Sequence, residues 1–90
     1  MLVDVSGKLY ELLGNSSANV ERHLSISLGY LDYKNCRRLD EQIKLISDSY
    51  VQVDLPDTLL DEAKANLPDG FDLSQGVNLF LLAGFLLGVK

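Results

Sequence analysis

Ninety residues suffice for one domain, or for one domain with an extension, and leave no room for a large active-site cleft. Apolar residues make up 47% of the chain and charged residues 23%, which is the composition of a globular protein rather than a disordered one. The formal net charge of −5 excludes a protein that binds nucleic acid through a generally basic surface. The single cysteine excludes a disulfide framework and an all-cysteine metal site. Residues 1–14 contain no basic leader before an apolar run, so we predict no signal peptide and a cytoplasmic location.

The charge is unevenly distributed along the chain. Residues 1–45 carry six basic and six acidic residues, whereas residues 46–90 carry two basic and seven acidic ones. The whole deficit of −5 therefore belongs to the second half. This asymmetry predicts two regions, a helical one at 1–47 with two or three helices and a dimerisation module at 48–90.

Helical periodicity dominates the first region. The first segment has helical spacing up to a break at 14–17, where a serine can cap the next helix; its apolar positions are Val5, Leu9, Leu12 and Leu13. From residue 18 to 47 the apolar stripe predicts either one long helix or two that meet near Asn35, and we favour a break. The N-terminal helices are then available for contact with a partner.

Three features of the first region can each be interpreted either as functional or as ordinary packing and surface residues. His23 lacks a second histidine or a suitably spaced acid or thiol, so we expect a surface or core-edge residue rather than a ligand or base. Cys36 stands before two arginines that would lower a thiol pKa, although a partly buried small side chain is the favoured interpretation. The only local basic patch comprises Lys34, Arg37, Arg38 and Lys44. One interpretation is that it contacts phosphate or an acidic partner. The interpretation that we favour is a solvated face paired with Asp40 and Glu41.

Residues 49–55 alternate strictly between apolar and polar side chains, which predicts a strand. No second strand signal is evident in the chain, and a lone strand cannot satisfy its own backbone groups. We therefore expect a second copy to supply the partner strand across a two-fold axis, as an obligate homodimer with a two-stranded antiparallel ribbon.

Two helices are expected after the strand. Pro56-Asp57 favours a helix start, and Ser74 is a candidate cap for a final helix that is apolar on every side. That helix is too short to span a bilayer, so we expect no membrane partner and burial on two sides. The predicted dimer core comprises Val51, Val53, Leu55, Leu60, Ala63, Val77 and Leu81.

The order strand, Leu-Pro-Asp, helix, turn, Leu-Ser and apolar helix resembles the ribbon-helix-helix family over residues 49–88. The resemblance is carried by residues 51–63, by residues 72–77, and by Leu81, Leu82 and Ala83. It implies a mainly α homodimer whose intermolecular ribbon enters the major groove of DNA. It further implies that Tyr50, Gln52 and Asp54 read bases, and that the N-terminus of the second helix binds phosphate through Ser74, Gln75 and Gly76.

We therefore expect a small dimeric DNA-binding regulator of the antitoxin or autorepressor type. The alternative is a dimeric adaptor, inhibitor or immunity-like protein that acts by protein–protein interaction without binding DNA. A third hypothesis is a helical bundle in which residues 49–55 form no ribbon. No catalytic constellation or metal cluster is evident, so we expect neither an enzyme nor a cofactor.

Overall fold

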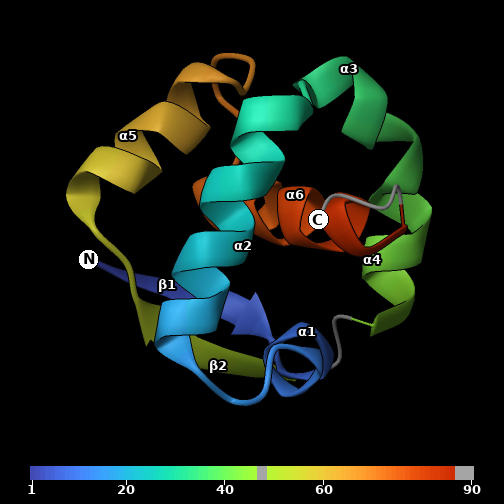
Figure 1. The fold of residues 1–90 in the computed structure, drawn as a ribbon. Helices are drawn as coiled ribbons and strands as arrows, with labels where there is room; N and C mark the ends of the chain where they lie inside the picture. Colours follow the sequence, from blue (N-terminus) through green and yellow to red (C-terminus); the bar gives the residue numbers. More distant parts are fainter. Residues whose placement is uncertain (47–48, 87–90) are drawn as a thin grey trace.

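The computed structural model describes residues 1–46 and 49–86, and the expected mainly α fold is confirmed (Figure 1). Residues 87–88, the end of the family resemblance, lie outside the described ranges. The elements in chain order are β1 (Leu2–Ser6), α1 (Gly7–Leu12), α2 (Ser17–Tyr30), α3 (Tyr33–Cys36), a 3₁₀ turn (Arg37–Leu39), α4 (Asp40–Ile46), β2 (Tyr50–Asp54), α5 (Asp57–Ala65) and α6 (Leu73–Leu86).

The strand expected at 49–55 is present as β2, but its partner lies in the same chain. β1 and β2 pair antiparallel, with Val3 opposite Val53 and Asp4 opposite Gln52. The prediction that β2 can find a partner only in a second copy is therefore wrong. Residues 3–6 alternate apolar and polar side chains as β2 does, but the apolar spacing from Val5 onward favours a helix, which begins only at Gly7.

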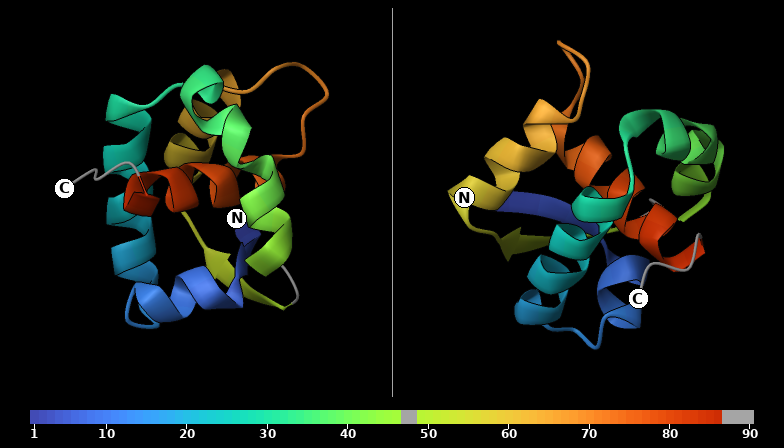
Figure 2. Two further views of the ribbon diagram at one scale, coloured as in Figure 1. Left: turned by 90° about the vertical axis from the view of Figure 1, so that its right-hand side faces the viewer. Right: turned by 45° about the horizontal axis from the view of Figure 1, so that its top comes forward.

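Helix α6 occupies the centre of the molecule. All its residues from Gly76 to Gly84 are buried, because α2, α4, α5 and the sheet surround it (Figures 1 and 2). An all-apolar helix is typical of such a position. The expected burial of this helix is confirmed, and its cover comes from the same chain. No helix in the described ranges is long and apolar enough to cross a bilayer.

Helix α2 crosses α6 at close range (Figure 2, left). A Cβ added at Gly84 of α6 would meet Ser27 and His23 of α2, so only glycine permits this approach. The Ser16 side chain accepts a hydrogen bond from the Asn19 N–H at 3.3 Å, which confirms the serine cap. The predicted helix break is also present, but α2 already ends at Tyr30, before Asn35.

One hydrophobic core includes residues from both predicted regions. β1 and α2 from the first region pack against β2 and α6 from the second. The residues expected to form a dimer core are accordingly enclosed by the chain itself. Val51 is half-buried, and the others are fully buried: Val53, Leu55, Leu60, Ala63, Val77 and Leu81. Their burial thus requires no second copy.

Candidate functional site at the open edge of the sheet

The hydrogen-bonding register makes the two edges of the sheet different. The Leu55 N–H donates to the Met1 carbonyl oxygen at 3.0 Å, and the Gly7 N–H donates to the Ser49 carbonyl oxygen at 2.9 Å. In an antiparallel ladder, pairs that exchange hydrogen bonds alternate with pairs whose backbone groups point outward. The odd-numbered pairs of β1 and β2 therefore exchange backbone hydrogen bonds with each other. The even-numbered residues of both strands direct their backbone N–H and C=O groups to the two outer edges of the sheet.

The outer edge of β1 is closed by a side chain of α6. The Asn78 Oδ1 accepts a hydrogen bond from the Ser6 N–H at 2.7 Å, and the Asn78 Nδ2 donates to the Asp4 carbonyl oxygen at 2.8 Å. One buried amide thus satisfies a donor and an acceptor that another strand would otherwise take. Asn78 is the polar residue within the apolar middle of the last helix, and that exception was the available sequence signal for its role.

The outer edge of β2 is open. The backbone groups of Tyr50, Gln52 and Asp54 point away from β1, and no hydrogen bond to them is found within residues 1–46 and 49–86. Figure 1 shows the order α6, β1 and β2 from the centre of the molecule toward its lower margin. The side chains of the three residues are exposed, as the alternation predicted, with Tyr50 52% exposed. The sheet can therefore be extended along the whole of β2, whereas the Asn78 amide occupies the β1 edge at Asp4 and Ser6.

Two hollows lie beside the sheet and share Asp4, Asp72 and Ser74. The larger has a volume of about 300 Å³ and reaches Tyr50 of β2, Lys44 of α4 and Gln75 of α6. The smaller, of about 260 Å³, reaches Gln52. Five of the predicted site residues thus lie around neighbouring hollows: Lys44, Tyr50, Gln52, Ser74 and Gln75. Sequence reasoning missed Asp4 and Asp72, because only the fold brings these distant residues together.

The start of α6 is already occupied by a carboxylate of the chain. The Asp72 Oδ1 accepts a hydrogen bond from the Ser74 N–H at 2.9 Å, and the Asp72 carbonyl oxygen accepts one from the Gly76 N–H at 3.0 Å. The prediction that Ser74 caps this helix is wrong, since its hydroxyl instead donates to the Asp4 carbonyl oxygen at 2.7 Å. Gly76 is buried under Leu67. A phosphate here would have to displace Asp72, so this geometry does not favour the implied phosphate site.

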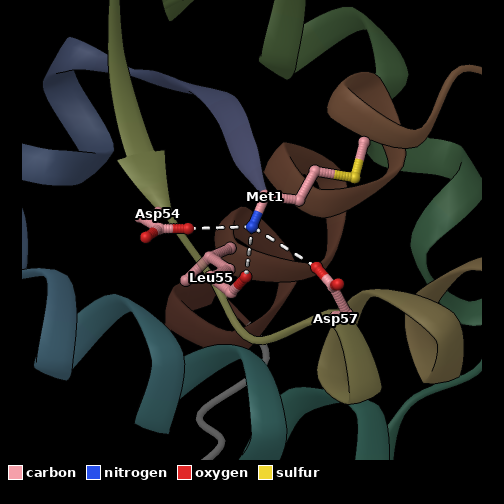
Figure 3. A network of polar contacts seen from close by, with 4 residues as sticks. All are labelled: Met1, Asp54, Leu55 and Asp57. Atoms are coloured by element: carbon pink, nitrogen blue, oxygen red, sulfur yellow. Dashed lines mark hydrogen bonds and ion pairs between the residues drawn. The ribbon is translucent and has the colours of Figure 1, made fainter.

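Asp54 is engaged by the amino group of Met1 (Figure 3). This ammonium donates to the Asp54 Oδ1 at 2.8 Å, to the Leu55 carbonyl oxygen at 3.1 Å and to the Asp57 Oδ1 at 3.3 Å. The hydrogen bond that the Met1 ammonium donates to Asp54 is the main cause that raises the pKa of the Met1 amino group above its ordinary value. The ion pair offsets the charge of Asp54 at the end of β2.

The basic residues are exposed and do not form a charged pocket. Lys34, Arg37 and Arg38 lie on α3 and the 3₁₀ turn, whereas Lys44 lies on α4 and approaches the Glu41 carboxylate at 3.9 Å. This pair agrees with the interpretation as a solvated face, and only Lys44 of the four lines a hollow beside the sheet.

Cys36 lies in the packed interior, and His23 lies at its margin. Burial is the main cause that raises the pKa of the Cys36 thiol to about 11, so a lowered thiol pKa beside the arginines is contradicted. The half-buried His23 places Nε2 3.2 Å from the Leu81 carbonyl oxygen and stacks on Phe85 with ring centroids 4.6 Å apart. Both side chains therefore hold positions that suit packing.

No cluster of histidine, cysteine and acidic side chains suitable for a metal ion occurs in the part of the chain that the structure describes. Comparisons with protein-family models, with curated proteins and with solved structures find no match. The open edge of β2, with the two hollows beside it, is therefore the candidate site defined by geometry alone.

Proposed function

We propose that this protein is a non-catalytic adaptor or inhibitor that binds a partner protein through β2. The single observation that carries this proposal is the open edge itself, with three backbone positions directed outward at Tyr50, Gln52 and Asp54. Addition of an extended segment to such an edge is a recurring mode of peptide recognition, in which backbone hydrogen bonds provide affinity.

The sequence of β2 supports the same proposal. Exposed edge strands are commonly protected from pairing by proline, by charged side chains, especially lysine, or by an inward-pointing charge. β2 reads Tyr-Val-Gln-Val-Asp and contains neither proline nor lysine, and its inward residues Val51 and Val53 are apolar. Its one charged side chain, Asp54, lies at the end of the strand and is paired with the Met1 ammonium. The edge of β1, in contrast, is protected by Asn78. The unprotected strand is thus the one available for a partner.

A photoreactive residue placed at position 52 tests this proposal in the cells that carry the gene. We expect Gln52 replaced in this way to give a covalent adduct with another polypeptide on irradiation. The matched control is the same residue at Glu62, which is exposed on α5 and lines neither hollow. Adducts of equal yield at both positions, or none at position 52, would contradict binding at the edge.

A DNA-binding regulator of the ribbon-helix-helix type is the second candidate. The observation that favours it is the exposure of Tyr50, Gln52 and Asp54 on one face of the sheet, as the resemblance implies for base-reading residues. In this candidate, two copies pair their open β2 edges and form a homodimer. A gel-shift assay with DNA from upstream of its own gene at about 50 and 200 mM salt tests it, since phosphate contacts make affinity fall steeply with salt. Absence of a shift at the lower salt would exclude this candidate.

A further inference from the structure

The acidic face beside the open edge indicates which kind of segment fits there. Side chains on opposite residues of an antiparallel pair share a face, so Asp4 lies on the same face as Gln52, and Leu2 on the same face as Asp54. Asp72, which directly precedes α6, lines both hollows together with Asp4. The cations that line these hollows are Lys44 in one and the Met1 ammonium in the other, and the latter is paired with Asp54 and Asp57.

We propose that the occupant of the β2 edge is an extended segment of another protein that carries lysine or arginine at alternate positions. This inference rests on the proposed function and adds the chemistry of the partner. A strand added to β2 lies about 4.8 Å from it, and every second side chain projects on the same face as Tyr50 and Gln52. Long basic side chains extend along a surface while their charged ends stay solvated, so they can reach across β2 toward Asp4 and Asp72.

The charge of the chain makes a second copy the poorer occupant. Two copies would each contribute a net charge of −5, and neither would bring a basic segment to the acidic side chains of the other. A basic segment instead meets charges of opposite sign, which favours encounter and fixes which side chains face the sheet. The two hollows, of about 300 and 260 Å³, lie across β2 from the open edge and provide room for the ends of long side chains that reach over this strand.

A set of short peptides and the full 90-residue chain test the proposal. The probe is a labelled, capped seven-residue peptide in which lysine alternates with valine, and the matched probe carries glutamate in place of each lysine. We expect fluorescence anisotropy to report binding of the lysine peptide only, with weaker binding as salt increases. Equal binding of the two peptides, or preference for the glutamate peptide, would overturn the inference about charge.

Matched variants assign the charge effect to the hollows. Asp4→Asn with Asp72→Asn removes two carboxylates and keeps a good helix cap at position 72. Exposed charge pairs contribute modestly, so we expect the affinity for the lysine peptide to fall by about 2- to 30-fold. Glu21→Gln with Glu62→Gln removes the same charge from exposed positions outside both hollows. An equal loss in both double variants would show that net charge alone is responsible, and would overturn the assignment.

Two negative outcomes can be distinguished: that no segment binds at the β2 edge, and that a segment binds there without a preference for basic side chains. Gln52→Pro removes an outward N–H and should abolish binding of any segment, whereas Gln52→Thr should retain it. Hydrogen exchange on the unaltered chain gives the same information without a variant, since bound peptide should slow exchange of the Gln52 amide. Binding without this protection would contradict the edge, and with it the proposed function. A dimeric mass in light scattering that becomes monomeric in Gln52→Pro would show that a second copy is the occupant, and would overturn the inference.

Discussion

Replacement of Asn78 by alanine should destabilise the fold far more than its position in an apolar helix suggests. The Ser6 N–H, which is fully buried, would lose its acceptor at 2.7 Å. A buried backbone group left without a partner costs about 1–3 kcal/mol. The Asp4 carbonyl oxygen would lose one hydrogen bond but keep the one from the Ser74 hydroxyl. The free energy of unfolding should therefore fall by about 2–4 kcal/mol in total.

Urea unfolding followed by circular dichroism measures this loss. With a slope of about 1 kcal/mol per molar urea, the midpoint for Asn78→Ala should decrease by about 2–4 M. The control is Asn66→Ala, in which the lost hydrogen bond, from Nδ2 to the Glu62 carbonyl oxygen, is exposed. We expect that control to lose about 1 kcal/mol or less. A loss below about 0.5 kcal/mol for Asn78→Ala would show that the amide does not satisfy the edge of β1.

Asn78→Asp separates the hydrogen bonds from packing. An ionised carboxylate of the same shape still accepts from the Ser6 N–H but cannot donate to the Asp4 carbonyl oxygen at 2.8 Å. Burial raises the pKa of such a carboxyl, and its protonated form again provides a donor. The stability deficit of this variant relative to the unaltered chain should therefore be smaller at pH 4 than at pH 7. A deficit that does not change with pH would contradict the donor role.

Three further predictions follow from packing and titration. Gly84→Ala should lower the free energy of unfolding by about 1–3 kcal/mol, because its methyl group would collide with side chains of α2. Gly29→Ala, at a helical position with open space around it, should raise the free energy of unfolding by up to about 1 kcal/mol. Equal effects of the two variants in urea unfolding would contradict the close crossing of α2 and α6. Because burial raises its thiol pKa to about 11, Cys36 should react slowly with a disulfide reagent at pH 8 until the chain is unfolded, and fast reaction of the folded chain would contradict its burial. The pKa of the Met1 ammonium is raised on folding, so its stabilising contribution is full below pH 8.0 and disappears as the pH rises through the raised pKa. Asp54→Asn should therefore reduce the loss of thermal stability at alkaline pH. An unchanged pH dependence in this variant would contradict the contacts of the Met1 ammonium with Asp54 and Asp57.

The alternation at 49–55 sufficed to predict β2 and its exposed side chains, and Pro56-Asp57 sufficed to predict the helix start, because these features depend on neighbouring residues. The partner of β2 could not be predicted in the same way. Residues 3–6 form too short an alternation to stand out, and their strand state depends on contacts made by the fold.

The candidate site was likewise only partly predictable. The outward direction of Tyr50 and Gln52 could be predicted because side-chain direction in a strand follows from position, whereas their assignment to a site came from the ribbon-helix-helix resemblance. The open edge, in contrast, depends on which edge Asn78 closes, and that depends on how α6 packs. The placement of Asp72 beside Asp4, which are far apart in the sequence, has the same origin.

The position of β1 between β2 and α6 also determines when the protein can fold during synthesis. β1 precedes its partners in the chain: they begin 44 and 67 residues after its own last residue, at Tyr50 and Leu73. Contacts between such distant segments require closure of long loops, which slows folding. While the rest of the chain is translated, β1 therefore lacks both neighbours, and both of its edges remain unpaired. Chaperones that shield nascent apolar segments should consequently act on β1, even though this strand lies between β2 and α6 in the finished hydrogen-bond network.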